Sequence, residues 1–161
     1  MVGRAAGQSA LAFGTQHLFA PLRFVNWRWP VFDNGDPVGG AALTLHAVDA
    51  ARIGQLLLQR GRSGGQQIVA EAWVDEQTRT HITLGNTGLM RNGGYGYQTW
   101  TDATSPRSIV AIGYGGQFVW VVPEQNLVVV AIAHWRGVND YDFHQSSALA
   151  SLVNDVRAAV R

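Results

Sequence analysis

The chain has 161 residues, which is enough for one domain that buries roughly two thirds of the surface its unfolded form would expose. Hydrophobic residues make up 47% and charged residues 14%, a composition that excludes a disordered or polar tract. Twelve basic residues, all of them arginine and spread along the chain, stand against eleven acidic ones. This balance gives no electrostatic reason to expect nucleic acid or a membrane as a partner.

Cysteine is absent, so the sequence predicts no disulfide and no thiolate site, and it leaves the cellular compartment open. Residues 1–7 lack the charged and apolar pattern of a leader peptide. No apolar run approaches the roughly 20 residues of a membrane span. We therefore expect neither an address signal nor a transmembrane helix in this stretch.

The first elements expected along the chain are a capped helix and a loop. Ser9 is placed to cap a helix that Pro21 ends. Residues 23–40 contain two tryptophans, two prolines and the pair Asn34-Gly35, so they predict an irregular loop pinned by aromatic side chains. The helix before the loop carries Leu11, Phe13, His17 and Leu18.

Two further helices are expected before residue 80. Thr44 is the predicted cap of the first, and Gly61 ends it. The second spans Ile68–Thr78 and places Trp73 and Val74 on its buried side. One face of the first of these helices carries Leu45, Val48, Ile53, Leu56 and Leu57.

Strands are expected in the second half of the chain. Glycine and asparagine are frequent in His81–Gly94, which predicts a loop long enough to form a functional lip. From Tyr95 onward the apolar period becomes that of strands, and a hairpin turn at Pro123–Asn126 joins the last two of them. The predicted strands are Tyr95–Thr101, Ser108–Tyr114, Gln117–Val122 and Leu127–Ala133.

The last two strands are apolar on both faces, so helices must cover the sheet on both sides. Ser147 is expected to open a closing helix that carries Leu149, Leu152, Val153, Val156 and Val160 at helical spacing. We therefore predict a single α+β unit over residues 1–161. Residues 1–94 are expected to be mostly helical, and residues 95–161 to hold the strands and the C-terminal helix.

Several short strings carry a resemblance that covers nearly the whole chain. They are Phe19-Ala20-Pro21-Leu22, Gly39-Gly40-Ala41-Ala42-Leu43-Thr44, Asp49-Ala50-Ala51-Arg52-Ile53-Gly54-Gln55-Leu56-Leu57-Leu58, Gly61-Arg62, Tyr95-Gly96-Tyr97, Gly113-Tyr114-Gly115-Gly116-Gln117 and Pro123-Glu124. Their order and spacing resemble the C-terminal portion of the β-lactamase-related serine hydrolases. This family includes penicillin-binding proteins, class C β-lactamases, esterases and 6-aminohexanoate-dimer hydrolase. The resemblance implies a partial β-lactamase/transpeptidase-like fold, with an antiparallel sheet and helices on both faces.

Enzymes of this family need three signatures: a Ser-x-x-Lys pair, a Tyr-x-Asn or Ser-x-Asn element, and a Lys-Thr-Gly element on a strand beside the site. The chain contains no lysine and no Tyr-x-Asn. The third signature alone has a counterpart, Tyr114-Gly115-Gly116, and esterase-like relatives also replace its lysine. By resemblance, Tyr114, Gly115 and Gly116 bind substrate, and the backbone N–H of Gln117 supplies half of the oxyanion hole.

The resemblance implies the C-terminal portion of a serine hydrolase that cleaves esters or amides through an acyl-enzyme. Without nucleophile and base, this chain alone is expected to be inactive. Its partner would be a small acyl compound, namely an ester, an amide or a β-lactam. A non-catalytic binding module derived from the fold and a truncated gene product remain open as alternatives. In the resembled fold, N-terminal strands complete the sheet, so two open sheet edges beside a three-stranded core are expected to favour a homo-oligomer.

Two other patterns suggest self-contained sites. Gly61–Gly65 matches Gly-x-Ser-x-Gly at Ser63, with Asp102 and His134 following, but it follows a predicted helix and so favours a helix stop with a tight turn. Asp140–His144 alternates carboxylates with other side chains before a histidine, yet a polar turn is favoured over a cation site. For Gly115-Gly116 the structural alternative is a bulge in a strand. No cofactor and no metal site are predicted.

Overall fold

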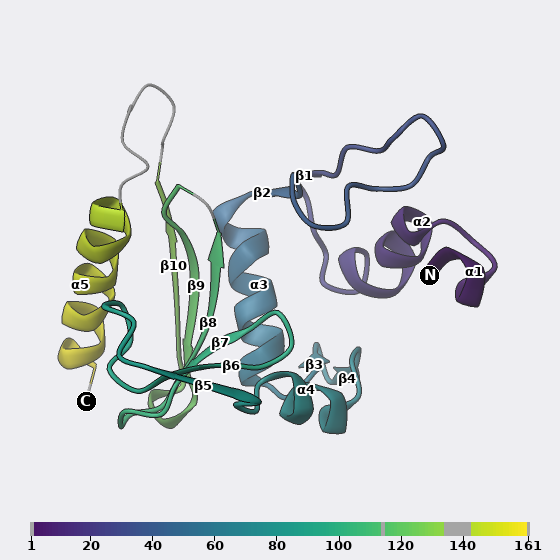
Figure 1. The fold of residues 1–161 in the computed structure, drawn as a ribbon. Coiled ribbons are helices and arrows are strands. Elements are labelled where there is room, and N and C mark those ends of the chain that lie inside the picture. Colours follow the sequence, from purple (N-terminus) through teal and green to yellow (C-terminus); the bar gives the residue numbers. More distant parts are fainter. Residues whose placement is uncertain (1, 114, 134–142, 161) are drawn as a thin grey trace.

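A six-stranded antiparallel sheet lies at the centre of the computed structural model, which describes residues 2–113, 115–133 and 143–160. The three longest strands are neighbours, and three shorter strands continue the sheet on one side (Figure 1). In spatial order the strands are β10 (Leu127–Ile132), β9 (Gln117–Val122), β8 (Ser108–Gly113), β7 (Trp100–Asp102), β6 (Gly93–Tyr95) and β5 (Ile82–Gly85).

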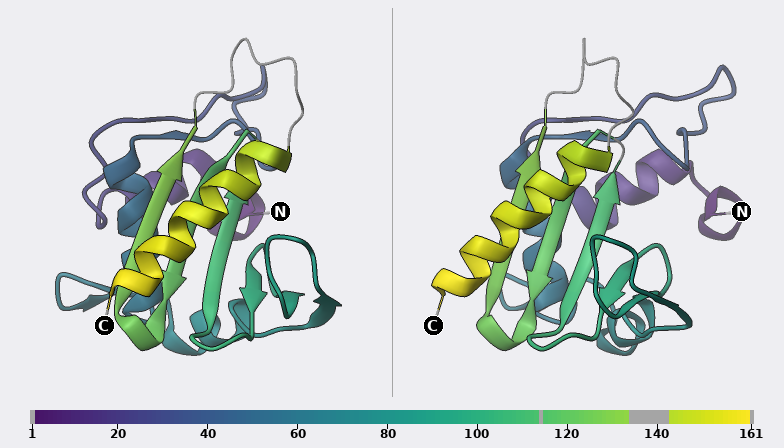
Figure 2. Two further views of the ribbon diagram at one scale, coloured as in Figure 1. Left: turned by 90° about the vertical axis from the view of Figure 1, so that its left-hand side faces the viewer. Right: turned by 60° about the vertical axis from the view of Figure 1, so that its left-hand side comes forward.

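Helices cover both faces of the long strands. Helix α3 (Ala47–Leu58) packs on β9 and β10 from one side, and α5 (Phe143–Ala159) lies on the opposite side (Figure 1). Figure 2 shows α5 running diagonally across the sheet. This arrangement confirms the predicted α+β class, with an antiparallel sheet between helices.

The remaining elements are short. They are α1 (Val2–Ala6), α2 (Ala10–Gly14), the π-helical turn η1 (Thr15–Phe19), α4 (Glu71–Gln77), the 3-10 turn η2 (Pro123–Gln125), and the paired strands β1 (Trp27–Arg28) with β2 (Thr44–Leu45) and β3 (Arg62–Ser63) with β4 (Gln66–Gln67). The elements α1 and α2 and the loop from β1 to β2 lie beyond α3, away from α5 (Figure 1). Among the described residues, no helix combines the length and the apolar character needed to span a bilayer.

Strand β9 occupies its predicted range, and β8 and β10 begin where predicted, because the side chains of these strands alternate between two apolar layers; β10 ends at Ile132, one residue before the predicted Ala133. On the α5 side, side chains from β8, β9 and α5 form one buried cluster with Met90 from the β5–β6 connection. The cluster contains Met90, Val110, Phe118, Trp120, Val122, Ala150 and Val153. The predicted turn at Pro123–Asn126 is also present, with Asn126 in the left-handed conformation that ends it.

On the other face, α3 approaches the sheet closely through a glycine. A Cβ built on Gly54 would lie 2.5 Å from Cγ1 of Val128, 2.9 Å from Cγ1 of Val119 and 3.5 Å from Cγ2 of Val121. Carbon atoms do not pack at the two shorter distances. Gly54 therefore sets the distance between α3 and the valines of β9 and β10.

Helix α3 begins later than predicted. Thr44 does not cap it, because Thr44 pairs with Arg28 in the β1–β2 ladder, and the residue before the helix is His46. Val48, predicted on the buried face, is 52% exposed, whereas Leu56 is buried as expected. Pairing with a distant strand has overridden the local capping preference of threonine.

Helix α4 is shorter than the predicted range Ile68–Thr78. Ile68 donates its backbone N–H to the carbonyl of Gly61 at 2.8 Å, which ties it to the preceding turn instead of to the helix. Val74 is buried as predicted, but Trp73 is 51% exposed and stacks on an aromatic ring in the β6–β7 turn. A helical period alone did not distinguish the buried side chain from its exposed neighbour.

The predicted loop His81–Gly94 contains β5 and the beginning of β6, which pair in antiparallel register. The predicted strand Tyr95–Thr101 is two strands, β6 and β7. They are separated by a turn in which the N–H of Gly96 bonds to the carbonyl of Thr99 at 2.8 Å. Both predictions were wrong because these short strands carry little alternation of their own and are defined by pairing with neighbours.

The helices near the two ends agree only partly with prediction. Ser9 caps α2, since its side-chain oxygen accepts the N–H of Ala12 at 3.1 Å, and the helix continues into η1. Helix α1 before it was not predicted. The closing helix begins at Phe143 instead of Ser147, and Leu152 on it is 55% exposed.

The sheet edges differ from expectation. Strand β8 pairs with β7 from Ser108 to Val110, so this edge is not open along those residues, and the predicted three-stranded core is wrong. Strand β10 has no further neighbour among residues 2–113, 115–133 and 143–160. Strand β6 spans residue 94, so the division at 94 into a helical and a strand region does not coincide with the end of an element and stays a prediction.

Candidate functional site

A tight turn joins β8 to β9 and carries the residues matched to the third signature. Strand β8 ends at Gly113, and β9 begins opposite it at Gln117. Gly115 and Gly116 have φ of 76° and 81°, the left-handed region that favours glycine. The two glycines therefore form a hairpin turn, not a bulge within a strand. Tyr114 lies outside the described residues.

Gly116 packs directly against two other elements. A Cβ built on it would lie 2.9 Å from Cβ of Ala133 and 2.9 Å from Cδ1 of Leu149. Ala133 follows β10 and donates its N–H to the carbonyl of Gly116 at 3.1 Å, while Leu149 belongs to α5. The turn thus rests on the end of β10 and on α5, with no room for a side chain.

Antiparallel pairing fixes the direction of the Gln117 N–H. Gln117 stands opposite Gly113 of β8 and opposite Ile132 of β10. The carbonyl of the preceding residue, Gly116, faces the β10 side, where Ala133 donates to it. Because successive backbone groups of a strand alternate in direction, the N–H of Gln117 points toward β8, at the end of the hairpin beside the turn.

The side chain of Gln117 makes contacts that the sequence did not indicate. Its Nε2 donates to the carbonyl of Ala133 at 2.9 Å and to the carbonyl of Gly115 at 3.4 Å. Ala133 lies 16 residues further along the chain, so no local pattern could have revealed this bond. Only the antiparallel register of β9 and β10 brings the two residues together.

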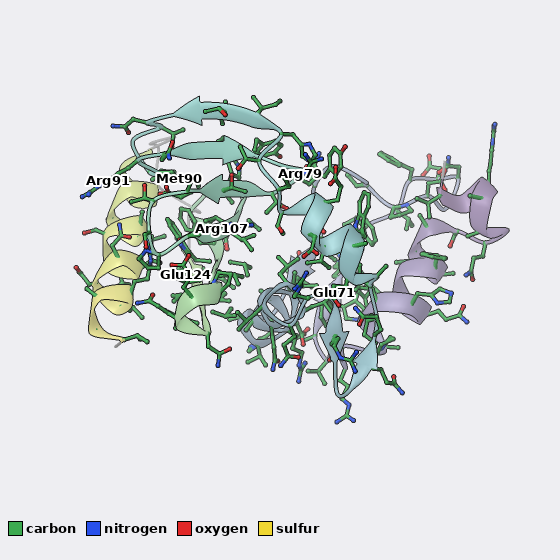
Figure 3. All side chains as sticks on the ribbon, turned by 90° about the horizontal axis from the view of Figure 1, so that it is seen from below. Glu71, Arg79, Met90, Arg91, Arg107 and Glu124 are labelled. Carbon is green, nitrogen blue, oxygen red and sulfur yellow. The ribbon has the colours of Figure 1, made fainter. Side chains whose placement is uncertain are left out.

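The predicted lip, residues 81–94, is in places built into the core. Met90 is 1% exposed and lies beside α5 (Figure 3), and its carbonyl accepts the N–H of Thr87 at 3.0 Å. The N–H groups of Arg91 and Asn92 each bond to the Asp102 carboxylate at 3.3 Å. These bonds hold the segment in an ordered turn, from which Met90 packs into the core.

The Gly-x-Ser-x-Gly match does not form a nucleophile elbow. Ser63 ends β3, and Gly64 and Gly65 turn the chain back into β4 with φ of 55° and 83°. An elbow must lead from a strand into a helix, whereas this turn leads into another strand. Asp102 is occupied by backbone N–H groups, including that of Thr104 at 2.9 Å, and His134 lies outside the described residues.

The acidic pattern at Asp140–His144 lies largely outside the described residues. Residues 140–142 lie outside the described residues, and the side chains of 143 and 144 are not described either. Within the ranges that are described, no group of three or more histidine, aspartate or glutamate side chains is placed to hold a metal ion. No metal role is assigned to this region of the chain.

A pocket of about 430 Å³ opens between α4 and the β7–β8 connection. Its charged side chains are largely paired: Arg60 lies 3.1 Å from Glu71, and Arg79 lies 2.5 Å from Glu76. Figure 3 labels Glu71 on α4 and Arg79 just after this helix. The hydrogen bond from Arg79 lowers the pKa of Glu76 below its usual value. Arg107 donates to a backbone carbonyl. Exposed pairs of this kind contribute little to stability, and the pocket holds no activated nucleophile.

Known proteins resemble this chain in sequence and in fold. Residues 1–154 match the family model described as Beta-lactamase. Over 111 residues the chain is 29% identical to the 6-aminohexanoate-dimer hydrolase of Paenarthrobacter ureafaciens. The matched region covers 66% of this chain and 28% of that protein.

Two solved structures share the fold. A protein from Bacillus anthracis assigned as a 6-aminohexanoate-dimer hydrolase superposes with a TM-score of 0.76 at 18% identity, over 98% of this chain and 41% of that one. The octameric penicillin-binding protein homologue of Pyrococcus abyssi superposes with a TM-score of 0.68 at 16% identity, over 95% of this chain and 40% of that one. The chain thus spans less than half the length of each of these relatives.

Proposed function

This chain belongs to the beta-lactamase family, and from that premise we propose that it is the C-terminal portion of a serine hydrolase that cleaves esters or amides through an acyl-enzyme. The observation that carries the proposal is the tight turn at Gly115 and Gly116, with Gln117 beside it. It stands in the order of the family's third signature, at the end of a strand. The partner proposed for it is a small acyl compound, namely an ester, an amide or a β-lactam.

We assign the acyl-binding wall to Tyr114, Gly115 and Gly116, because small residues let a substrate carbonyl approach the backbone. The N–H of Gln117 is the proposed oxyanion donor. In this role an acyl oxygen replaces the carbonyl of Gly113 as the acceptor of that N–H. The exchange becomes favourable when the oxygen gains negative charge in the tetrahedral intermediate, since hydrogen bonds to charged oxygens are the stronger ones.

The nucleophile and its base are proposed to come from a separate segment. A Ser-x-x-Lys pair needs a lysine one helical turn after the serine, and the 161 residues contain no lysine. The nucleophile's own N–H would supply the second oxyanion donor. The chain by itself is therefore proposed to be inactive.

A second candidate is a non-catalytic binding module, favoured by the retention of the glycine turn in a chain without lysine. The DNA immediately upstream separates the candidates. If the chain is part of a hydrolase, we expect the upstream DNA to encode an in-frame Ser-x-x-Lys. An unrelated upstream sequence would overturn the hydrolase proposal. The chain would then be a binding module if it binds an acyl compound, and a truncated gene product if it does not.

We also propose that the chain associates with copies of itself through the outer edge of β10. This strand ends the sheet among the described residues, and it carries neither proline nor charge. Unprotected edge strands favour pairing with another chain. The related Pyrococcus abyssi protein is described as octameric, which supports the proposal that this chain assembles.

A further inference from the structure

The side-chain amide of Gln117 joins the two backbone segments that border the glycine turn. Its Nε2 donates to the carbonyl of Ala133, which follows β10, and to the carbonyl of Gly115 within the turn. An amide NH₂ group has two hydrogens, so both bonds can exist at the same time. These two bonds form the Gln117 clamp.

The clamp and α5 hold the turn from opposite faces of the sheet. Side chains alternate along β9, so Gln117 shares a face with Val119, which lies against α3. Gly116 instead contacts Leu149 of α5 on the other face. The turn is therefore fixed by the amide on one side and by packing on the other.

We propose that Gln117 is a positioning residue whose side chain holds the turn while its own backbone N–H changes acceptor. The proposal rests on the proposed function, in which that N–H leaves the carbonyl of Gly113 for an acyl oxygen. Loss of the Gly113 bond would otherwise loosen the hairpin at its closing pair. The clamp, together with the bond from Ala133 to Gly116, keeps the turn attached to β10 during this exchange.

A merely structural glutamine would behave differently. If the amide only contributed to overall stability, its removal would speed amide hydrogen exchange throughout β9 and β10 in the same proportion. If Gln117 positions the turn, faster amide exchange is confined to the turn and to Ala133. The two possibilities are therefore distinguished by where along the hairpin exchange accelerates.

The test is amide hydrogen exchange by NMR in the 161-residue chain and in Gln117→Leu. In the variant we expect exchange of the backbone N–H at position 117 and at Ala133 to accelerate about fivefold to tenfold, the equivalent of one lost hydrogen bond, with less than a twofold change at Val121 in mid-strand. Gln117→Glu, which places carboxylate oxygens against two carbonyls, should have at least this effect. Gln55→Leu, at an exposed glutamine on α3, is the matched control and should leave the turn unchanged.

Uniform acceleration along β9, or no acceleration at Ala133, would overturn the positioning role. The unsubstituted chain gives a test that does not depend on how the variants fold. Its side-chain NH₂ of Gln117 should exchange more slowly than that of Gln55. Equal exchange rates would also overturn the positioning role. Titration with phenylacetamide tests the proposed function separately. Failure of this small amide to shift the Gln117 backbone N–H would contradict that function, while the exchange data decide on the clamp.

Discussion

At the scale of single residues, Asp49 shows how a buried charge is held in this fold. Its carboxylate is fully buried on α3 and accepts the N–H groups of Asn26 at 3.1 Å and Val25 at 3.3 Å, and the side chain of Arg52. Burial raises the pKa of Asp49, but the hydrogen bonds from Asn26, Val25 and Arg52 outweigh it, so the pKa lies below its usual value. The charged form therefore fastens the segment after η1 to α3.

The direction of this shift predicts how stability depends on pH. A lowered folded-state pKa means that the contribution of Asp49 is complete above its unfolded pKa of about 3.9 and is lost as the pH falls through the folded-state value. Asp49→Asn should lower the free energy of unfolding by about 2–4 kcal/mol at pH 7 and flatten its decline below pH 4. Urea unfolding at pH 7, 5 and 3 measures both effects. The exposed Asp33→Asn is the control, and an equally steep acid decline in Asp49→Asn would contradict this role.

At the scale of elements, the β8–β9 turn combines backbone strain with close packing. Gly116 has φ of 81° and a site for Cβ already occupied by Ala133 and Leu149. Gly88 has nearly the same conformation, with φ of 83°, but a Cβ on it would meet nothing within 4 Å. The two glycines therefore separate the effect of conformation from the effect of contact.

Gly88→Ala should lower the free energy of unfolding by about 1–2 kcal/mol, the cost of a left-handed alanine. Gly116→Ala should lower it by about 1–3 kcal/mol more, because its methyl group must also displace the end of β10 or α5. Urea unfolding of both variants measures the difference. Equal losses would show that the turn has room for a side chain and does not rest on Ala133 and Leu149.

Elements with a strong internal pattern were predictable from the sequence, and elements defined by their neighbours were not. The strands from Ser108, Gln117 and Leu127 carry continuous apolar runs, and the structure confirms them. Strand β5 and the strand at Thr44–Leu45 are short, and only pairing with distant residues defines them. The shift of the α3 start and the missed β5 both follow from this difference.

The candidate site also has one part that a local sequence pattern predicts and one part that only strand pairing defines. Gly115 and Gly116 were identified from a local string, and the turn they form agrees with their conformational freedom. The clamp from Gln117 to Ala133 depends on the register of β9 and β10, which the sequence leaves unspecified. The roles of Tyr114, Gly115, Gly116 and Gln117 in binding substrate remain predictions.

At the scale of the whole molecule, the outer edge of β10 is the surface through which we propose self-association. The N–H of Ala133 faces β9, so alternation turns the N–H groups of Val130 and Ile132 away from β9, toward the open edge. Ile132 is 50% exposed there, and no lysine is present in the chain to oppose pairing. Edge-to-edge pairing of two copies would satisfy these groups.

Light scattering at increasing concentration should therefore show a dimer or larger species, and Ile132→Lys should shift it toward the monomer by at least tenfold in dissociation constant. A lysine at the end of the open strand puts a solvated charge at the edge, which opposes pairing with another chain. Leu152→Lys changes a similarly exposed residue on α5 and should leave association unchanged. A well-folded monomer at high concentration, with slow exchange along the β10 edge, would contradict the assembly.

We propose that these 161 residues provide the acyl-binding wall of a serine hydrolase without its nucleophile. Turnover of nitrocefin and of short p-nitrophenyl esters by the purified chain, compared with buffer and with Ser63→Ala, tests this proposal. The predicted result is a rate equal to background for both proteins, because neither contains a Ser-x-x-Lys pair. Turnover above background that is abolished by Ser63→Ala would contradict the claim and place a complete active site within this chain.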